Sequence, residues 1–415
     1  MITLAGTGGS YRLQGIMENI WISSPGGVLA VLCAVAAFWF AVDQITEWKL
    51  FQYVPPLLFI YATPVFLNNC DVIPSSGSPV YSGLSDYVLP AFIVLMLIKV
   101  DVPAAVRIMG KGVLVMLMGT AGVVTGAVVS YFIVHRWLAP DAWTGFGALA
   151  GSWIGGTGNM AAVSEMLDTS PEQFGLAVIA DNVIYLVWLP ILLASKNVAD
   201  KFNKWTGVPE GRLKMMDTAA EVNLEAERTP AMRDYLYLAA VAIGVTWLAT
   251  LLAAEIFALM QANYPALEDI LNESTWRILL LTTIALSLST TRVSRLPNAT
   301  ALGTAMIYVF VAGMGARASV EGLAQAPAFL LGAFIWIAIH GAFCVAGAKI
   351  FKVDVHSAAI ASAANIGAAA SAPIVAAFHR PSLVPVSILM ALIGYALGNY
   401  VAPIAAHLAR IAAGQ

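Results

Sequence analysis

Charged side chains are scarce in this sequence of 415 residues, because aspartate, glutamate, lysine and arginine together make up only 11% of it. Hydrophobic residues make up 60%, and a soluble domain of this length cannot bury so much apolar surface. The near-neutral composition gives no basic surface for nucleic acid. The composition therefore excludes a soluble protein and predicts an all-α polytopic membrane protein.

Cysteine is equally scarce, since the chain has three, isolated in or near apolar segments: Cys33, Cys70 and Cys344. Their spacing fits no disulfide framework, metal site or redox motif. The sequence also lacks a nucleophile paired with a base, a phosphate-binding loop and a histidine cluster. We therefore expect neither an enzyme nor an ATP-driven pump, and neither a cofactor nor a structural metal. The first twenty-five residues have no signal-peptide pattern, so insertion is expected to rely on the spans.

Apolar segments long enough to cross the bilayer, which takes about 17 to 25 residues each, number about ten in this sequence. They lie near residues 26–42, 50–68, 84–100, 113–135, 173–195, 234–261, 276–290, 299–316, 326–350 and 382–405. Two more apolar segments, 144–170 and 356–379, are interrupted by glycine, serine, threonine and asparagine. Irregular backbone survives at membrane depth only where it is buried in protein or lines a cavity. We expect these two segments to form re-entrant or discontinuous helical hairpins.

Basic residues place the loops, because lysine and arginine concentrate on the cytoplasmic side. The charged segment 196–233 and the turn with Arg107 and Lys111 both look cytoplasmic, which requires segment 144–170 to re-enter rather than cross. Each half then has an odd number of crossings, so the second half is inverted relative to the first. The predicted order is an external N-terminal segment (1–25), the first inverted repeat (26–195), a cytoplasmic linker (196–233), the second inverted repeat (234–405) and a C-terminal tail (406–415).

The two interrupted stretches, Gly151-Ser-Trp-Ile-Gly-Gly-Thr-Gly-Asn159 and Ser362-Ala-Ala-Asn-Ile-Gly-Ala-Ala-Ala-Ser371, are the candidate binding motifs. Unwound backbone exposes amide and carbonyl groups, and a half-helix that starts after the break presents a positive end suited to a carboxylate. The alanines after Gly367 favour helix, with Ser371 and Pro373 marking its start, so we expect the second motif to contribute less. Close helix packing by small residues is the alternative explanation. The candidate substrate-binding residues are Ser152, Gly155, Gly156, Thr157, Gly158, Asn159, Asn365, Gly367 and Ser371.

Asp181 and Asn182 are the candidate ion-coupling residues. A carboxylate in the middle of a span costs about 2.5 to 3.5 kcal/mol on insertion scales, so it usually faces a polar cavity or serves as an ion or proton site. A transient sodium ion near Thr157, Asn159 and Asp181 is one prediction, and a purely structural carboxylate is the alternative. Asn399 aligns a few residues away from Asp181, which suggests that coupling belongs to the first half. His340 is interpreted as a neutral helix-to-helix contact.

The motifs resemble the YjcL-like family of uncharacterised integral membrane proteins, which carry a GSW-x-GGTGN stretch in the first half and S-A-A-N-I-G in the second. That family is grouped with cation/proton antiporters and anion transporters, and Gly155-Gly156-Thr157-Gly158 is similar to the hairpin turn of its sodium-coupled glutamate and citrate symporters. The resemblance implies a fixed scaffold, a core that moves like an elevator, and a homodimer. The chain departs from the pattern at Gly367-Ala-Ala-Ala370, where a second glycine-rich turn is expected.

These observations predict a secondary transporter, coupled to Na⁺ or H⁺, that moves a small organic anion or amino-acid-like solute across a bacterial cytoplasmic membrane. The expected partners are the solute, the lipid bilayer and a second copy of the chain. The alternative is a cation/proton antiporter without an organic substrate, which a central carboxylate also suits.

Overall fold

The computed structural model describes residues 20–46, 51, 56–101, 110–209, 228–268, 270–318 and 325–415. Helices and the turns between them account for all the regular secondary structure in these ranges. Eight helical segments within them are long and apolar enough to cross a membrane. The prediction of an all-helical polytopic membrane protein is therefore confirmed.

Two of the ten predicted spans are not among these eight segments. The apolar stretches at 50–68 and 276–290 correspond to α4 (Pro56–Asn69) and α15 (Glu273–Ser289), with 14 and 17 residues. At about 1.5 Å per residue the longer one extends about 25 Å, which is less than the hydrocarbon thickness of about 30 Å. Within the described residues the chain thus has eight candidate spans, since α15 is shorter than a full crossing and α4 is described only from Pro56 onward.

The helices of the first half appear in the order α2 (Pro25–Thr46), α4, α5 (Pro79–Gly83), the π-helical turn η1 (Leu84–Val88), α6 (Leu89–Leu97), α8 (Lys111–Val134), α9 (Ala142–Gly155), α10 (Thr157–Met166), α11 (Pro171–Ala194) and α12 (Ala199–Thr206). Those of the second half are α14 (Met232–Asn263), α15, the 3₁₀ turn η5 (Arg292–Arg295), α16 (Ala299–Arg317), α17 (Ala326–Phe351), α18 (Val355–Asn365), α19 (Ala368–His379) and α20 (Val384–Ala412).

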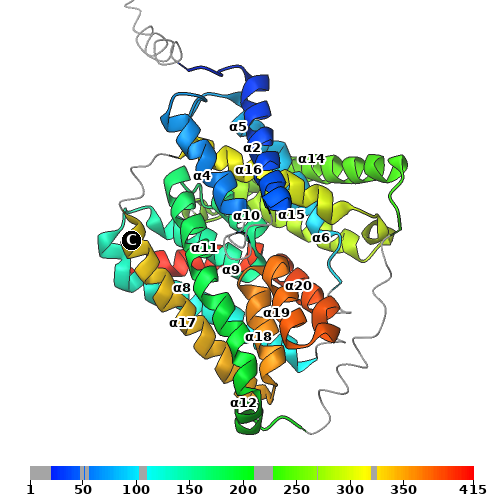
Figure 1. The fold of residues 1–415 in the computed structure, drawn as a ribbon. Coiled ribbons are helices and arrows are strands. Elements are labelled where there is room, and N and C mark those ends of the chain that lie inside the picture. Colours follow the sequence, from blue (N-terminus) through cyan, green and yellow to red (C-terminus); the bar gives the residue numbers. More distant parts are fainter. Residues whose placement is uncertain are drawn as a thin grey trace, which may run out of the picture.

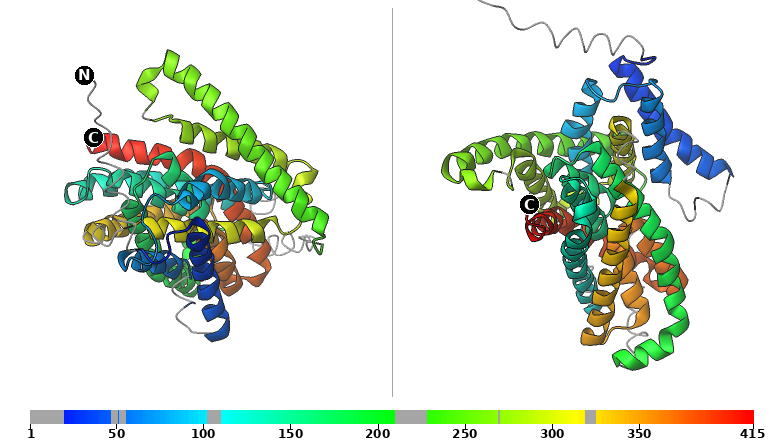
Figure 2. Two further views of the ribbon diagram at one scale, coloured as in Figure 1. Left: turned by 90° about the horizontal axis from the view of Figure 1, so that it is seen from above. Right: turned by 90° about the vertical axis from the view of Figure 1, so that its left-hand side faces the viewer.

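The helices separate into two groups that lie side by side (Figures 1 and 2). The α6 group contains α2, α4, α5, α6, α14, α15 and α16, and the α8 group contains α8, α9, α10, α11, α17, α18, α19 and α20. Each group takes helices from both halves of the chain. The boundary between the groups therefore brings together segments that are far apart in the sequence.

The α8 group is built around the pair α8 and α17, which pack along each other. Small residues of α8 allow the close approach: a Cβ atom added at Gly126 would lie 2.1 Å from Cδ1 of Trp336. The indole Nε1 of Trp336 donates a hydrogen bond to the carbonyl oxygen of Val123 at 2.7 Å. Glycine on one helix and a large aromatic ring on the other are a common way to join membrane helices closely.

Most of the predicted N-terminal segment lies outside the described residues, which begin at Ile20, and of the predicted linker residues 210–227 lie outside them. The described start of the linker, α12, packs against the ends of α17 and α18. There Asn203 accepts a hydrogen bond from the backbone N–H of Val355 at 2.9 Å, and the Lys349 ammonium donates to the carbonyl of Trp205. The linker thus fixes the point at which α18 begins.

Candidate functional site

The first interrupted motif forms a helical hairpin. Helix α9 ends at Gly155 and α10 begins at Thr157, with Gly156 between them at φ 83° and ψ −177°, a conformation that is essentially restricted to glycine. Helix α10 then packs back against α9, and a Cβ atom at Gly151 would lie 2.7 Å from the carbonyl oxygen of Asn159. The helix is broken where the glycine cluster predicts.

The second interrupted motif forms another hairpin, with α18 ending at Asn365 and α19 beginning at Ala368. The predicted restart at Ser371 and Pro373 is wrong, because Gly367 and Ala368, at φ 84° and φ 47°, provide the turn and the next alanines are strong helix formers. The Ser371 hydroxyl lies within hydrogen-bond distance of the carbonyl oxygens of Ala363 (2.8 Å) and Ile366 (2.7 Å). It therefore satisfies backbone groups inside its own hairpin.

The two hairpins start from opposite ends of α11. At its beginning, the hydroxyl of Ser170 donates to the carboxylate of Asp141 at 3.0 Å, which ties α11 to the base of the first hairpin. At its end, His379 Nε2 bonds the carbonyl of Leu192 at 2.9 Å, which ties α11 to the base of the second. The tips meet between these points, since a Cβ atom at Gly156 would lie 3.0 Å from that of Ala368.

Asp181 lies beside the first hairpin, in the middle of α11. One carboxylate oxygen accepts a hydrogen bond from the Ser152 hydroxyl at 3.1 Å, and the other accepts one from Nε1 of Trp153 at 2.9 Å. Among the described residues no cationic side chain forms an ion pair with this carboxylate. Two neutral donors hold the charge in place but do not neutralise it, which leaves a site suited to a proton or a small cation.

A polar stripe on α11 faces both hairpins. Asp181, Tyr185 and Trp188 are spaced at i, i+4 and i+7, so they share one face of the helix. Tyr185 lies at the second tip, where its Cε2 would be 3.2 Å from a Cβ atom at Gly367, and Trp188 Nε1 donates to the Ser362 hydroxyl at 3.0 Å. Asn182 is not part of this stripe, because its amide donates to Val178 O within α11 at 2.7 Å.

A buried polar cluster surrounds the second hairpin. Nδ1 of His340 donates to the carbonyl oxygen of Gly119 at 2.9 Å, which leaves Nε2 to accept from the Ser362 hydroxyl at 2.9 Å. Asn365 donates from Nδ2 to the Thr120 hydroxyl at 3.0 Å, while its Oδ1 has no hydrogen-bond partner in the described structure. His340 therefore makes the helix-to-helix contact that the sequence suggested, with hydrogen bonds to two other helices instead of one.

The first hairpin is also joined to α20 and, through it, to the α6 group. Nδ2 of Asn159 donates to the carbonyl of Tyr395 at 3.0 Å and to Oδ1 of Asn399 at 2.8 Å. Asn399 in turn donates to the hydroxyl of Thr282 on α15 at 2.9 Å. Sequence reasoning recognised neither Thr282 nor the role of Asn399.

Two glycines in α20 allow this approach. A Cβ atom at Gly394 would lie 2.3 Å from the carbonyl oxygen of Ile154, and one at Gly398 would lie 2.4 Å from Nδ2 of Asn159. Gly394 and Gly398 have the G-x-x-x-G spacing of close helix contacts in membranes, a signal that was present in the sequence.

The predicted sodium ligands Thr157, Asn159 and Asp181 form no hydrogen bonds with one another among the described residues. The hydrogen bonds of Asn159 run to α20, whereas those of Asp181 run to α9, and no described contact joins the two side chains. Thr157 is half-buried at the tip, and no hydrogen bond of its hydroxyl appears in the described structure. The described residues also contain no group of three or more histidine, cysteine, aspartate or glutamate side chains placed to hold a metal ion.

The paired hairpins and the membrane-crossing helices define a multi-pass helical membrane protein. Residues 30–411 match the family described as protein of unknown function DUF819, and the chain belongs to this family. It is similar to the uncharacterized membrane protein YjcL of Bacillus subtilis (strain 168), with 25% identity over 390 residues that cover 92% of this chain and 95% of that protein. The similarity to a bacterial membrane protein thus extends over nearly the whole chain.

Proposed function

We propose that the protein is an ion-coupled secondary transporter of a small organic anion or amino-acid-like solute in a bacterial cytoplasmic membrane. The observation that supports this proposal most strongly is the meeting of two oppositely directed helical hairpins beside Asp181, a half-buried carboxylate that forms no ion pair within the described residues. Broken helices that meet near the middle of a membrane protein are typical of substrate and ion sites in secondary transporters.

The order of the helices supports an inverted repeat. In this proposal α2, α4 and α5–α6 correspond to α14, α15 and α16, while α8, the first hairpin and α11 correspond to α17, the second hairpin and α20. The hairpins leave opposite ends of α11, as inversion requires. The short helices α4 and α15 would complete ten crossings together with the eight longer segments.

The division into two groups supports an elevator mechanism. In both proposed repeats, the helices at the start of the repeat belong to the α6 group. The two long helices and the hairpin that follow them in each repeat belong to the α8 group. We propose that the α6 group is the fixed scaffold and that the α8 group is the mobile core. The homodimer that the resemblance implies would then be held by the scaffold, and crosslinking in native membranes tests it.

The first hairpin is proposed to bind the solute and Asp181 the coupling ion. Helix α10 begins at the tip, where its unpaired amide groups and positive end suit a carboxylate. Thr157 is half-buried there, and Asn159 faces the boundary between the two groups. Asn365 and Ser371 bond within the α8 group, so they would shape the second tip without contacting the solute.

A second candidate function is a cation/proton antiporter. The pocket next to Asn159, between Phe92, Gly158, Tyr395 and Asn399, has a volume of about 10 Å³. That is room for about one water molecule, which suits an ion better than an organic solute.

Flux measurements in proteoliposomes separate the two candidates. With a trapped pH indicator and buffer alone, an antiporter gives proton movement when Na⁺ or K⁺ is added outside, whereas a symporter gives none. A symporter gives ion-dependent uptake only after carboxylates or amino acids are supplied. A protein that binds no solute or ion in a thermal-stability screen and gives no flux in either assay would contradict both proposals, because a bound ligand stabilises the folded state.

A further inference from the structure

Three pockets lie in sequence along the boundary between the two helix groups. The outer pocket, of about 330 Å³, contains Ser82, Ser85 and Asp86 from the start of the α5–α6 run, and Glu165 from the end of α10. The second is the narrow pocket next to Asn159, which contains Phe92 and Leu97 of α6. The third, of about 970 Å³, contains Val100 and Asp101, which follow α6. From Asp86 to Val100 a helix rises about 21 Å, so the three pockets are spaced along most of a bilayer core.

Helix α15 passes the same three positions in the same order. Arg277 bonds Asp86 beside the outer pocket at 3.2 Å, Thr282 bonds Asn399 beside the narrow pocket at 2.9 Å, and Ser289 contributes to the third pocket. Helices α10 and α20 form the opposite wall. On α20, Ala396 lines the third pocket and Asn399, one turn further along, lines the narrow pocket. The three pockets therefore follow one another along α6 and α15, and Phe92 packs against Gly158 at the narrow one.

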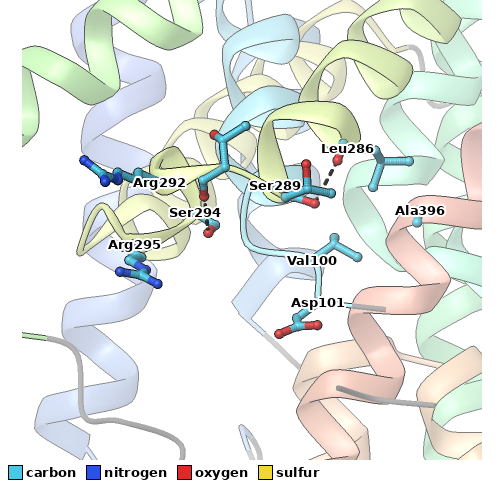
Figure 3. Close-up of a pocket in the computed structure, with 10 residues that line it drawn as sticks. Val100, Asp101, Leu286, Ser289, Arg292, Ser294, Arg295 and Ala396 are labelled. Atoms are coloured by element: carbon cyan, nitrogen blue, oxygen red, sulfur yellow. Dashed lines mark hydrogen bonds between the residues drawn. The ribbon is translucent and has the colours of Figure 1, made fainter. Parts of the chain in front are cut away.

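The two ends of this row of pockets differ in charge. In the outer pocket the acidic side chains of Asp86 and Glu165 lie 3.2 Å and 3.7 Å from the guanidinium of Arg277, and Arg317 lies in the same wall. In the third pocket Arg292 and Arg295 lie on the loop after α15 and Asp101 lies across from them (Figure 3). Neither arginine forms an ion pair within the described chain. The described residues that line the outer pocket therefore include two acidic and one basic side chain, whereas those that line the third include one acidic and two basic side chains.

The hydroxyl groups of the third pocket already donate to backbone carbonyls. Ser289 donates to Leu286 O, Thr290 to Ser287 O and Ser294 to Thr291 O, each at 2.8 Å. Their remaining lone pairs accept hydrogen bonds and repel an anion. Donors for a carboxylate or phosphate therefore come from the two guanidinium groups, each with five N–H groups.

We propose that this third pocket, between the loop after α15 and the end of α6, is an anion-binding vestibule in which Arg292 and Arg295 concentrate a carboxylate- or phosphate-bearing solute as it passes between Asn159 and this end of the boundary. The proposal rests on the proposed transport function for the passage of the solute. The binding of anions by the pocket does not depend on transport.

Cysteine labelling measures the charge preference of the pocket directly. Full-length protein with Cys33, Cys70 and Cys344 replaced by serine would carry Ala396→Cys in the third pocket or, as the matched control, Ser82→Cys in the outer pocket. Each is labelled in phosphatidylcholine nanodiscs with an anionic reagent, sulfonatoethyl methanethiosulfonate, and a cationic one, trimethylammonium-ethyl methanethiosulfonate. For each protein we compare the labelling rate of the anionic reagent with that of the cationic reagent. We expect this ratio of rates to be at least about tenfold higher for the Ala396→Cys protein than for the control, because focused charge raises the local anion concentration.

The double substitution Arg292→Gln/Arg295→Gln is expected to remove this preference at position 396 and leave the ratio at position 82 unchanged. Citrate or inorganic phosphate should slow labelling of the Ala396→Cys protein only when both arginines are present. The proposal would be overturned if the ratio of anionic to cationic labelling rates were equal at positions 396 and 82. It would also be overturned if the faster anionic labelling at position 396 survived the double substitution.

A lipid headgroup also carries a phosphate, and changing the lipid composition of the nanodiscs distinguishes it from a free anion. If added phosphatidylglycerol blocks the Ala396→Cys site and free anions give no protection, the pocket binds lipid and the vestibule proposal is wrong. Because labelling needs no flux, a protein that fails to transport can still show the anion preference. A protein that transports but shows no preference would leave the transport proposal standing without the vestibule.

Discussion

The two helical hairpins have the same outline but different surroundings. The first tip lies at the boundary between the helix groups, where Asn159 bonds to α20 and Gly158 packs against Phe92 of the α6 group. The second tip is enclosed by the α8 group, where Ser371 bonds its own carbonyls and Ser362 and Asn365 bond to α8, α11 and α17. In the proposed transporter, this contrast would leave the first hairpin to contact the solute and the second to hold the core together.

The tip glycines give the largest expected difference between the hairpins. Gly156→Ala forces a side chain into a backbone conformation that costs about 1 to 3 kcal/mol, and its methyl group would meet Ala368. Gly367 is in the left-handed region, where alanine costs about 1 to 2 kcal/mol. We expect Gly156→Ala to lower the thermal stability of the purified protein more and to abolish flux. A larger loss of thermal stability from Gly367→Ala than from Gly156→Ala would contradict this expectation.

The tip asparagines are the next test. Asn159→Ala removes two hydrogen bonds and leaves buried acceptors on Tyr395 and Asn399, at a cost of about 1 to 3 kcal/mol. Asn365→Ala removes one hydrogen bond and also an unpaired oxygen, so its cost should be smaller. Ligand-induced thermal shifts should disappear only for Asn159→Ala. Loss of ligand response in both variants would show that both tips contact the solute.

The two serines separate coupling from packing. Ser152→Ala removes one of the two donors to Asp181, so the ion concentration needed for half-maximal flux should change while stability changes by less than about 1 kcal/mol. Ser371→Ala leaves tip carbonyls without their hydroxyl donor and should lower stability by about 1 kcal/mol with the ion dependence unchanged. Ion titrations of flux, combined with thermal unfolding, check both outcomes.

The smallest expected effect is a pH dependence at the base of the second hairpin. Nδ1 of His356 lies 3.0 Å from Nδ1 of His379, and His379 also donates from Nε2 to Leu192. Burial lowers the pKa of both imidazoles below the usual value of about 6.5, although Asp354 nearby acts in the opposite direction. The folded state therefore binds fewer protons than the unfolded state, and stability is lost as pH falls below about 6.5.

Thermal unfolding between about pH 7.5 and pH 5.5 measures this loss. His379→Gln should flatten the dependence, whereas Asp141→Asn, at the base of the first hairpin, should leave it unchanged. An unaltered slope in the His379→Gln protein would exclude the histidine pair as its cause.

The sequence predicts the class of protein and the positions of the breaks, because composition and glycine clusters act locally. The apolar excess identifies a membrane protein, and the break at Gly156 lies inside the predicted cluster. Asp181 was also recognisable, since a carboxylate in an apolar span is rare.

The partners of these residues could not be predicted, because they depend on which helices pack together. Asn159 and Asn399 are 240 positions apart, and their hydrogen bond exists only because α9 and α10 lie against α20. Trp153 belonged to the recognised motif, yet only its position next to α11 shows that its indole bonds Asp181.

The measurement that tests the account most directly is ion-coupled flux by the Asp181→Asn protein in proteoliposomes, with Asp200→Asn on the exposed surface of α12 as the matched control. Asparagine keeps the size of the side chain and accepts a hydrogen bond, so the hairpin contact should persist while the charge is lost. The account predicts that Asp181→Asn folds with unchanged cooperativity and loses ion-driven flux, whereas Asp200→Asn retains it. Full ion-driven flux by the Asp181→Asn protein would contradict it.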